Sequence, residues 1–247
     1  MIGRVWSAVL AVCLLVPVLV AAVTVVPGVP WAGPTSEGTG PFAYVLGLYG
    51  PYWLRSAFLA LGVGGTALLV GTPAGVVLGR TRSRVLRAWL STPLVVPGIA
   101  LAVGIVALWG AVRGLLLLAA AHVLVVLPLV VRTVAAAVQG ADLDALLQQA
   151  RVLGESPARA WWRVGVPVLR RPLLASLLMA AAVSWGEFNV TFLLATPDRA
   201  TFPAALYLAF TTNSLPVGGA ALVLFLLPVV PLAWLAQAVG GEARQAA

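Results

Sequence analysis

The sequence is short of the residues on which many enzymes depend. It contains no lysine, one cysteine and one histidine, and only 9% of its 247 residues are charged. Without lysine the chain cannot contain a G-x-x-x-x-G-K-[ST] phosphate-binding loop or a Schiff-base lysine. It also has no H-E-x-x-H pair and no nucleophile elbow. Cys13 stands alone in an apolar run and is expected to be a small buried hydrophobe. No catalytic residue is therefore predicted.

Apolar residues make up 62% of the chain, and the mean hydropathy is +1.05. A bilayer-spanning helix needs about 20 apolar residues. Six segments meet this requirement: about 5–27, 56–79, 88–110, 114–138, 167–195 and 217–238. The first is longer than the roughly 7 to 15 residues of a signal-peptide core, so it is expected to be a retained helix. The sequence predicts an all-α polytopic membrane protein that forms one domain over residues 1–247, without an internal repeat.

Four segments separate the predicted spans. They are a Gly/Pro-rich loop at 28–55, an arginine cluster at 80–87, a polar segment at 139–166 and a short loop at 196–216. If these loops alternate between the two sides of the membrane, one side holds 12 arginines and the other holds three, Arg55, Arg113 and Arg199. The positive-inside rule then places both termini, the arginine cluster and the polar segment in the cytoplasm.

The polar segment has the pattern of two short helices that meet at a bend. Leu143, Leu146, Leu147, Ala150 and Leu153 fall on one helical face,. Asp142 is expected to cap the first helix, Gly154 to end it in a left-handed conformation, and Ser156 with Pro157 to start the second. Pro167 and Pro172 are expected to restart the chain toward the fifth span.

Two explanations of this segment remain open at this point. In the first, its arginines and its two tryptophans, Trp161 and Trp162, anchor the segment on anionic lipid,. In the second, the bent pair of helices is a docking element for a cytoplasmic partner. A metal site built from Asp142 and Asp144 is disfavoured, because residues at i and i+2 on a helix do not face each other. No metal ligand is predicted.

The polar segment resembles the cytoplasmic EAA loop of bacterial ABC importer permeases. That loop usually reads Glu-Ala-Ala, three residues, Gly, nine residues, Ile, one residue, Leu-Pro, and the corresponding residues here are Ala150, Gly154, Val164, Val166 and Pro167. Gln148 replaces the usual Glu, and Gln149 replaces the first Ala. The similar loop covers about 141–167, within a similar region of about 50–240.

Further motifs extend the resemblance. The run from Ser184 to Thr191, which contains Gly186-Glu187-Phe188, and the later Thr201-Phe202-Pro203 are similar to signatures of permeases for polyamines, molybdate, sulfate and ferric iron. His122, Pro128 and Arg132 fit the same subset. The chain is identified on these residues as similar to a type I ABC importer permease.

The resemblance implies a non-catalytic subunit of the bacterial inner membrane that works by alternating access. The residues expected to couple it to a separate ATPase are Gln148, Ala150, Arg151, Gly154, Val164 and Pro167. ATP and Mg²⁺ would bind that ATPase, and no cofactor is expected in this chain. The other implied partners are an identical or related second permease, an extracytoplasmic solute-binding protein and the lipid bilayer, with no nucleic acid. The substrate class stays open between polyamines, oxyanions and ferric iron.

A few polar side chains interrupt the predicted spans, where an unpaired charge costs about 2.5 to 3.5 kcal/mol. Ser184, Glu187 and Thr191 follow at i, i+3 and i+7 of the predicted fifth span, with Asn189 elsewhere on its circumference. They line a transport pathway or hydrogen-bond across a seam between subunits. For His122, hydrogen bonding between helices is favoured over substrate contact. A membrane-embedded enzyme and a proton-coupled carrier that uses Glu187 are the alternative functions.

Overall fold

Long helices dominate the fold. The computed structural model describes residues 18–20, 22–25, 40–81, 83, 85, 88, 98–109 and 114–245, and within these ranges it contains helices and turns but no strand. Four helical segments in this part of the chain are long and apolar enough to cross a membrane: Pro41–Arg80, Leu115–Gly140, Pro157–Gly186 and Leu215–Gly240. The all-α membrane fold is confirmed. The first predicted span, 5–27, lies largely outside the described residues, so the count of six spans stays a prediction.

Helix α2 (Pro41–Arg80) is longer than the predicted second span. The expected loop at 28–55 is wrong from residue 41 onward, because Pro41 begins the helix and several of its aromatic residues, Tyr49 and Trp53 among them, pack inside the protein. Tyr49 is buried, and the Trp53 indole donates a hydrogen bond to the Leu224 carbonyl at 3.1 Å. The glycines and prolines that suggested a loop are therefore accommodated in a helix whose packing outweighs their low helix propensity.

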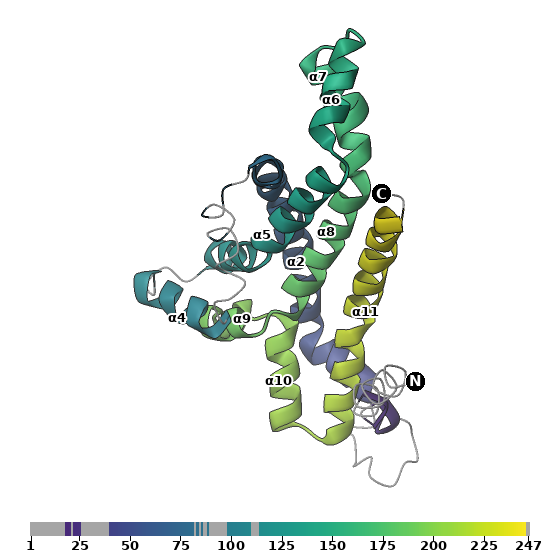
Figure 1. Cartoon of the computed structure of the whole chain (residues 1–247). Helices are drawn as coiled ribbons and strands as arrows, with labels where there is room; N and C mark the ends of the chain where they lie inside the picture. Colours follow the sequence, from purple (N-terminus) through teal and green to yellow (C-terminus); the bar gives the residue numbers. More distant parts are fainter. Residues whose placement is uncertain are drawn as a thin grey trace, which may run out of the picture.

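Helix α5 (Leu115–Gly140), the predicted fourth span, packs tightly along α2 (Figure 1). Gly71, Gly75 and Gly79 of α2 lie against Val130, Val134 and Val138 of α5, respectively. A Cβ atom at Gly75 would lie only 2.6 Å from the Val134 Cβ. The numbers rise together along both helices, so α2 and α5 run parallel, and the glycines allow the two backbones to approach closely.

The predicted fifth span is interrupted. Helix α8 (Val166–Gly186) ends before Glu187, and a short helix α9 (Asn189–Leu194) follows in a new direction beside α4 (Gly98–Trp109). The prediction of one continuous helix over 167–195 is wrong, because it joins the apolar residues on both sides of the break into one span and places the polar residues between them on the same helix. Figure 1 shows α4 and α9 together at one side of the bundle.

The expected short loop at 196–216 contains a one-turn 3₁₀ helix, η3 (Pro197–Arg199), and helix α10 (Phe202–Thr212). Helix α10 packs against α11 (Leu215–Gln245), which contains the whole predicted sixth span. Phe202, Trp185 and Ala205 belong to one buried cluster between α2, α8, α10 and α11. An apolar helix of 11 residues is too short to span a bilayer, which explains why a search for spans misses α10,.

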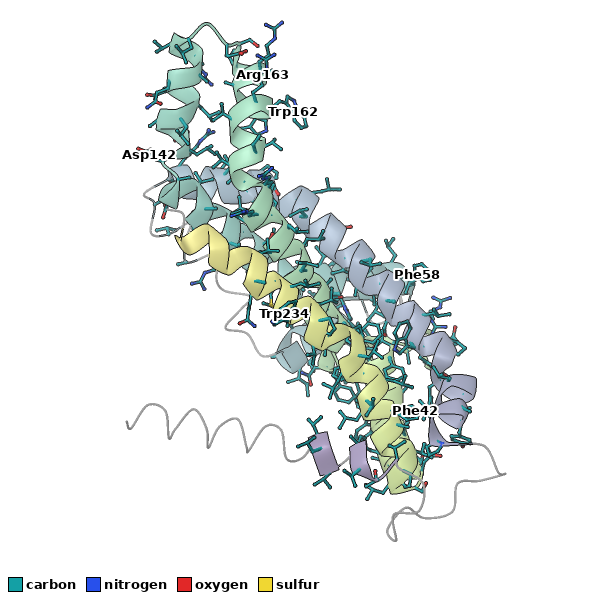
Figure 2. All side chains as sticks on the ribbon, turned by 90° about the vertical axis from the view of Figure 1, so that its right-hand side faces the viewer. Phe42, Phe58, Asp142, Trp162, Arg163 and Trp234 are labelled. Atoms are coloured by element: carbon teal, nitrogen blue, oxygen red, sulfur yellow. The ribbon has the colours of Figure 1, made fainter. Side chains whose placement is uncertain are left out.

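A helical hairpin projects beyond the ends of α2 and α5 (Figures 1 and 2). It consists of α6 (Leu143–Val152), α7 (Pro157–Ala160) and a π-helical turn, η2 (Trp161–Gly165). The predicted pair of helices is confirmed, but Pro167 and Pro172 do not restart the chain. The helix runs on from Pro157 to Gly186, and the π-helical turn η2 lies directly before Pro167, which supplies no backbone N–H to the helix,.

Candidate functional site: the hairpin and the α8–α9 break

The bend of the hairpin forms as the sequence predicts. Gly154 has a φ of +91°, the left-handed conformation that residues with a Cβ atom adopt at a cost,. Ser156 caps α7 by accepting a hydrogen bond from the Arg159 backbone N–H at 3.4 Å. Across the bend, Arg163 forms an ion pair with Glu155 at 2.6 Å. The two arms of the hairpin are therefore fixed to each other at their tip.

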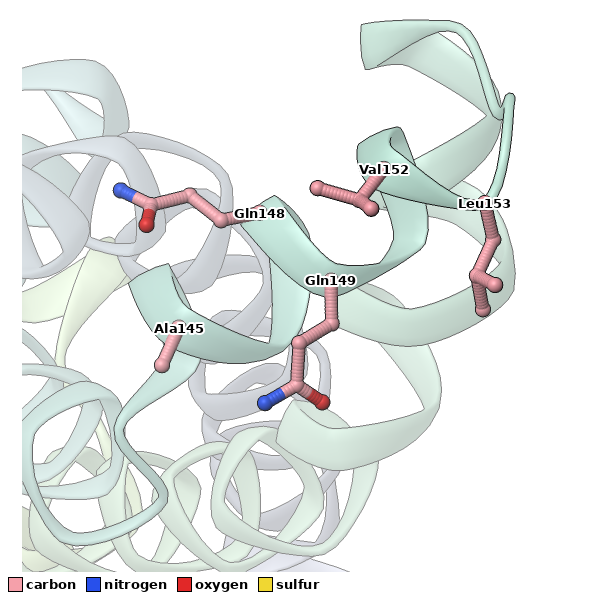
Figure 3. Close-up of a pocket in the computed structure, with 5 residues that line it drawn as sticks. All are labelled: Ala145, Gln148, Gln149, Val152 and Leu153. Atoms are coloured by element: carbon pink, nitrogen blue, oxygen red, sulfur yellow. The ribbon is translucent and has the colours of Figure 1, made fainter.

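One face of α6 packs inward, and the other is open. Leu143, Leu147 and Ala150 are buried, but Leu153, expected on the same face, is 85% exposed. Val164 is half-buried within the hairpin, and Pro167 is exposed. The open face forms a shallow hollow of about 500 Å³ (Figure 3), lined by Ala145, Gln148, Gln149, Val152 and Leu153. Gln148 and Arg151 lie exposed on α6, so a partner can reach them.

The base of the hairpin is joined to α2. The Arg80 guanidinium, at the end of α2, forms an ion pair with the Asp144 carboxylate at 2.8 Å. The Gln139 side chain donates a hydrogen bond to the Gly79 carbonyl at 3.2 Å. Asp142 does not cap α6 as predicted, because it takes a left-handed φ of +44° and its side chain makes no capping bond. The sequence did not single out Arg80 as the partner of Asp144.

Inside the bundle, four polar side chains form one buried network around the α8–α9 break. His122 Nδ1 lies 3.0 Å from the Ser184 hydroxyl, and His122 Nε2 lies 3.1 Å from the Thr191 hydroxyl. Thr201 donates a hydrogen bond to the same Thr191 oxygen at 3.2 Å. The network joins α5, α8, α9 and the residue before α10, and its four side chains are all buried. Both ring nitrogens therefore have partners, as buried polar groups require.

The structure brings Ser184 and Thr191 together through His122, although they do not share a continuous helix. Thr201 was noted only as part of a motif, and its hydrogen bond to Thr191 could not be anticipated without the break in the helix. Ser56, which no motif marks, accepts a hydrogen bond from the Phe202 backbone N–H at 2.7 Å. A serine within an apolar stretch was the only sequence signal for it, and the structure shows that this serine is buried.

Glu187 and Asn189 lie at the break itself. The half-buried Glu187 Oε1 accepts a hydrogen bond from the Val190 backbone N–H at 3.1 Å, which satisfies a free amide at the start of α9,. A Cβ atom at Gly98, the first described residue of α4, would lie 3.4 Å from the same oxygen. Asn189 is exposed. Glu187 is thus close to α4 and supports the backbone of α9.

No group of three or more His, Cys, Asp or Glu side chains that could hold a metal ion occurs in the described part of the chain. The polar groups instead form two sets. Those of the hairpin are charged and exposed, and those of the break are mostly neutral and buried. Together with the membrane-spanning helices, these features define a membrane-embedded protein with a polar helical hairpin projecting at one end.

Comparison with known proteins agrees with this class. Residues 67–242 match the family model of the binding-protein-dependent transport system inner membrane component, and the chain belongs to this family. It is a permease subunit of a binding-protein-dependent ABC importer, embedded in the inner membrane by several spans. Transport subunits of this kind work with ATPase and solute-binding partners in general.

Individual relatives support the assignment. The chain is 32% identical over 198 residues to the molybdenum transport system permease protein ModB of Mycobacterium tuberculosis and to that of Mycobacterium bovis, covering 71% of this chain and 72% of each relative. It is 27% identical to a putative ABC transporter permease protein of Streptomyces antibioticus, over 74% of this chain and 82% of that protein. An inward-facing structure of the MetNI methionine ABC transporter has the same fold, with a TM-score of 0.64 and 16% identity over 83% of this chain and 99% of that one.

Proposed function

We propose that this permease imports a tetrahedral oxyanion of the molybdate type. The observation that carries the proposal is the 32% identity to two mycobacterial molybdenum permeases over most of both chains. Polyamine and ferric-iron import, which the sequence motifs left open, are the competing substrates.

The hairpin is the proposed contact with a separate ATP-binding subunit, in which ATP and Mg²⁺ would bind. Its shape supports this role, since a bent pair of helices with an open apolar hollow suits insertion into a groove,. The residues proposed to couple the two proteins are Gln148, Ala150, Arg151, Gly154, Val164 and Pro167. Ala150 acts from the buried side of α6, where it holds the helix against the other arm.

The transport pathway is proposed to form between this chain and a second permease, identical or related. Both termini are proposed to lie in the cytoplasm, on the side of the hairpin and of most arginines. The parallel course of α2 and α5 supports the alternation of spans on which this proposal rests, because the second and fourth spans of an alternating chain run in the same direction. Within the membrane, the His122 network is proposed to fix the shape of the α8–α9 break. Asn189, exposed beside it, is the better placed of the two residues at the break to face a pathway.

Two measurements test the function. Co-purification in detergent with the ATP-binding subunit of the same transport system should succeed for the native chain and fail for Gly154→Trp. Failure of the native chain to bind any ATPase would contradict the proposed docking and reopen the enzyme and carrier alternatives. Uptake by the reconstituted system should then be measured with molybdate, sulfate, putrescine and ferric iron. Uptake of putrescine or iron without molybdate or sulfate would overturn the oxyanion assignment.

A further inference from the structure

The tip of the hairpin carries a net positive charge that its own acids do not neutralise. Between Ala145 and Arg163 the chain has three arginines and one glutamate. The glutamate, Glu155, is paired with Arg163. Among the residues that the structure describes, neither Arg151 nor Arg159 has an ion-pair partner, and both are exposed. The acid nearest the base, Asp144, is likewise occupied by Arg80.

The length of helix between the tip and the apolar part of 157–186 argues against lipid as the partner of Arg159. Helix 157–186 is continuous, and Arg170 and Arg171 are the last charged residues before its apolar part. At a rise of about 1.5 Å per residue, Arg159 lies about 16 Å from Arg170 along the helix axis, on the side away from the apolar part,. That is about twice the Debye length of roughly 8 Å at physiological salt, so lipid headgroups attract Arg159 only weakly.

The surface between the arginines is apolar and uncharged. Val152 is 87% exposed and Leu153 is 85% exposed, directly beside the bend. Gln148 and Gln149 complete the hollow of α6 with neutral amides (Figure 3). This surface therefore offers hydrophobic area, hydrogen bonds and positive charge to a partner. The single carboxylate of α6, that of Asp144, is paired with Arg80.

From this distribution we infer that the ATP-binding subunit which receives the hairpin presents carboxylates opposite Arg151 and Arg159, around an apolar floor that accepts Val152 and Leu153. The inference rests on the docking role proposed above. Gln148, which lies exposed in the hollow, adds hydrogen-bonding capacity but no charge to this surface,. In this interface the permease contributes the basic surface, and the ATP-binding subunit contributes the acidic one. Complementary charge of this kind fixes the register of docking and speeds association.

The test is the affinity of the native chain in nanodiscs of phosphatidylcholine for the purified ATP-binding subunit, measured against salt concentration. Raising the salt should weaken binding. Arg151→Glu and Arg159→Glu should each weaken it by about tenfold, while Arg170→Glu, the same charge change nearer the membrane, should alter it less than about threefold. When the facing carboxylate of the ATP-binding subunit is replaced by lysine, binding to the Glu variants should be restored, because the two charges are then exchanged.

Gln148→Glu tests the inference by the direction in which the affinity changes. The added negative charge should weaken binding severalfold if the facing surface of the ATP-binding subunit is acidic. A stronger complex would show that this surface is basic and would overturn the inference. The inference also fails if both arginine reversals bind normally while Gly154→Trp does not bind, a result that leaves the docking role intact. It fails too if the reversals act only in nanodiscs that contain phosphatidylglycerol, since the arginines would then serve the lipid. Absence of binding by the native chain would count against the docking role itself.

Discussion

The hairpin and the α8–α9 break are both polar interruptions of an apolar protein, but they use polarity in opposite ways. In the hairpin, charged side chains remain exposed and are joined by short ion pairs such as Arg163–Glu155. At the break, neutral side chains around His122 are buried and satisfy one another. Water solvates the two charges of an exposed ion pair when they separate, so such a pair contributes only about 0.2 to 1 kcal/mol to the free energy of unfolding. A buried group left without a partner costs about 1 to 3 kcal/mol. Mutations in the hairpin should therefore affect coupling, and mutations at the break should affect folding.

The largest effect on transport is expected from Gly154→Val. The φ of +91° at this position is unfavourable for a β-branched residue, so the variant should straighten or reshape the bend,. Because no neighbouring atom would lie within 4 Å of a Cβ at this position, the fault would lie in the backbone and not in a clash. Uptake should fall more than about tenfold while the amount of protein in the membrane stays unchanged.

Gly140→Val is the matched control for this variant. Gly140 ends α5 near the base of the hairpin, is equally free of neighbours around a Cβ position and has an ordinary helical φ. Its uptake should remain near normal. Loss of Gly154→Val from the membrane, with Gly140→Val retained, would instead assign the bend a role in folding.

The next effect in size is expected from His122→Leu. The substitution has a similar volume but leaves the buried Ser184 hydroxyl without its partner, at a cost of about 1 to 3 kcal/mol,. The melting temperature in detergent should fall, and uptake should fall with it by roughly tenfold through loss of folded protein. His122→Gln, which can still donate and accept, should recover part of both. A normal melting temperature with lost uptake would show that His122 acts on substrate and would contradict the structural role.

The two regions also differ in how far the sequence predicted them. The hairpin was predicted with its bend at Gly154 and its cap at Ser156, because glycine and serine are local signals that act within a few residues. Leu153 was misplaced, since a periodic pattern does not show where a helix loses its partner. The break was not predicted, because Glu187 and Asn189 lie beside Gly98 of α4, and His122 of α5 bridges Ser184 and Thr191 across the break. Such contacts join segments that are distant in sequence and leave no periodic signal.

A moderate effect is expected when the hairpin is detached from α2. Arg80→Asp should reduce uptake about threefold, because it replaces the attraction between Arg80 and Asp144 by repulsion and loosens the base of the hairpin,. Asp144→Arg should do the same. The double variant with the charges exchanged should recover most uptake, and ATP hydrolysis per molecule transported should return toward the native ratio. Equal losses in the single and double variants would mean that the pair does not position the hairpin.

The smallest effect is expected from Glu187→Gln, and it separates a structural carboxylate from one that faces the pathway. Glutamine keeps an oxygen that can accept the hydrogen bond from the Val190 N–H, so uptake should stay within about twofold of the native rate,. Glu187→Ala removes the acceptor and should lower the melting temperature, because an amide at the start of α9 is left unsatisfied. If the charge itself acted in transport, Gln would impair uptake as much as Ala does, although its melting temperature would stay near the native value. The comparison of these two variants therefore decides whether Glu187 belongs with the buried set that maintains shape or with a pathway through which the substrate moves.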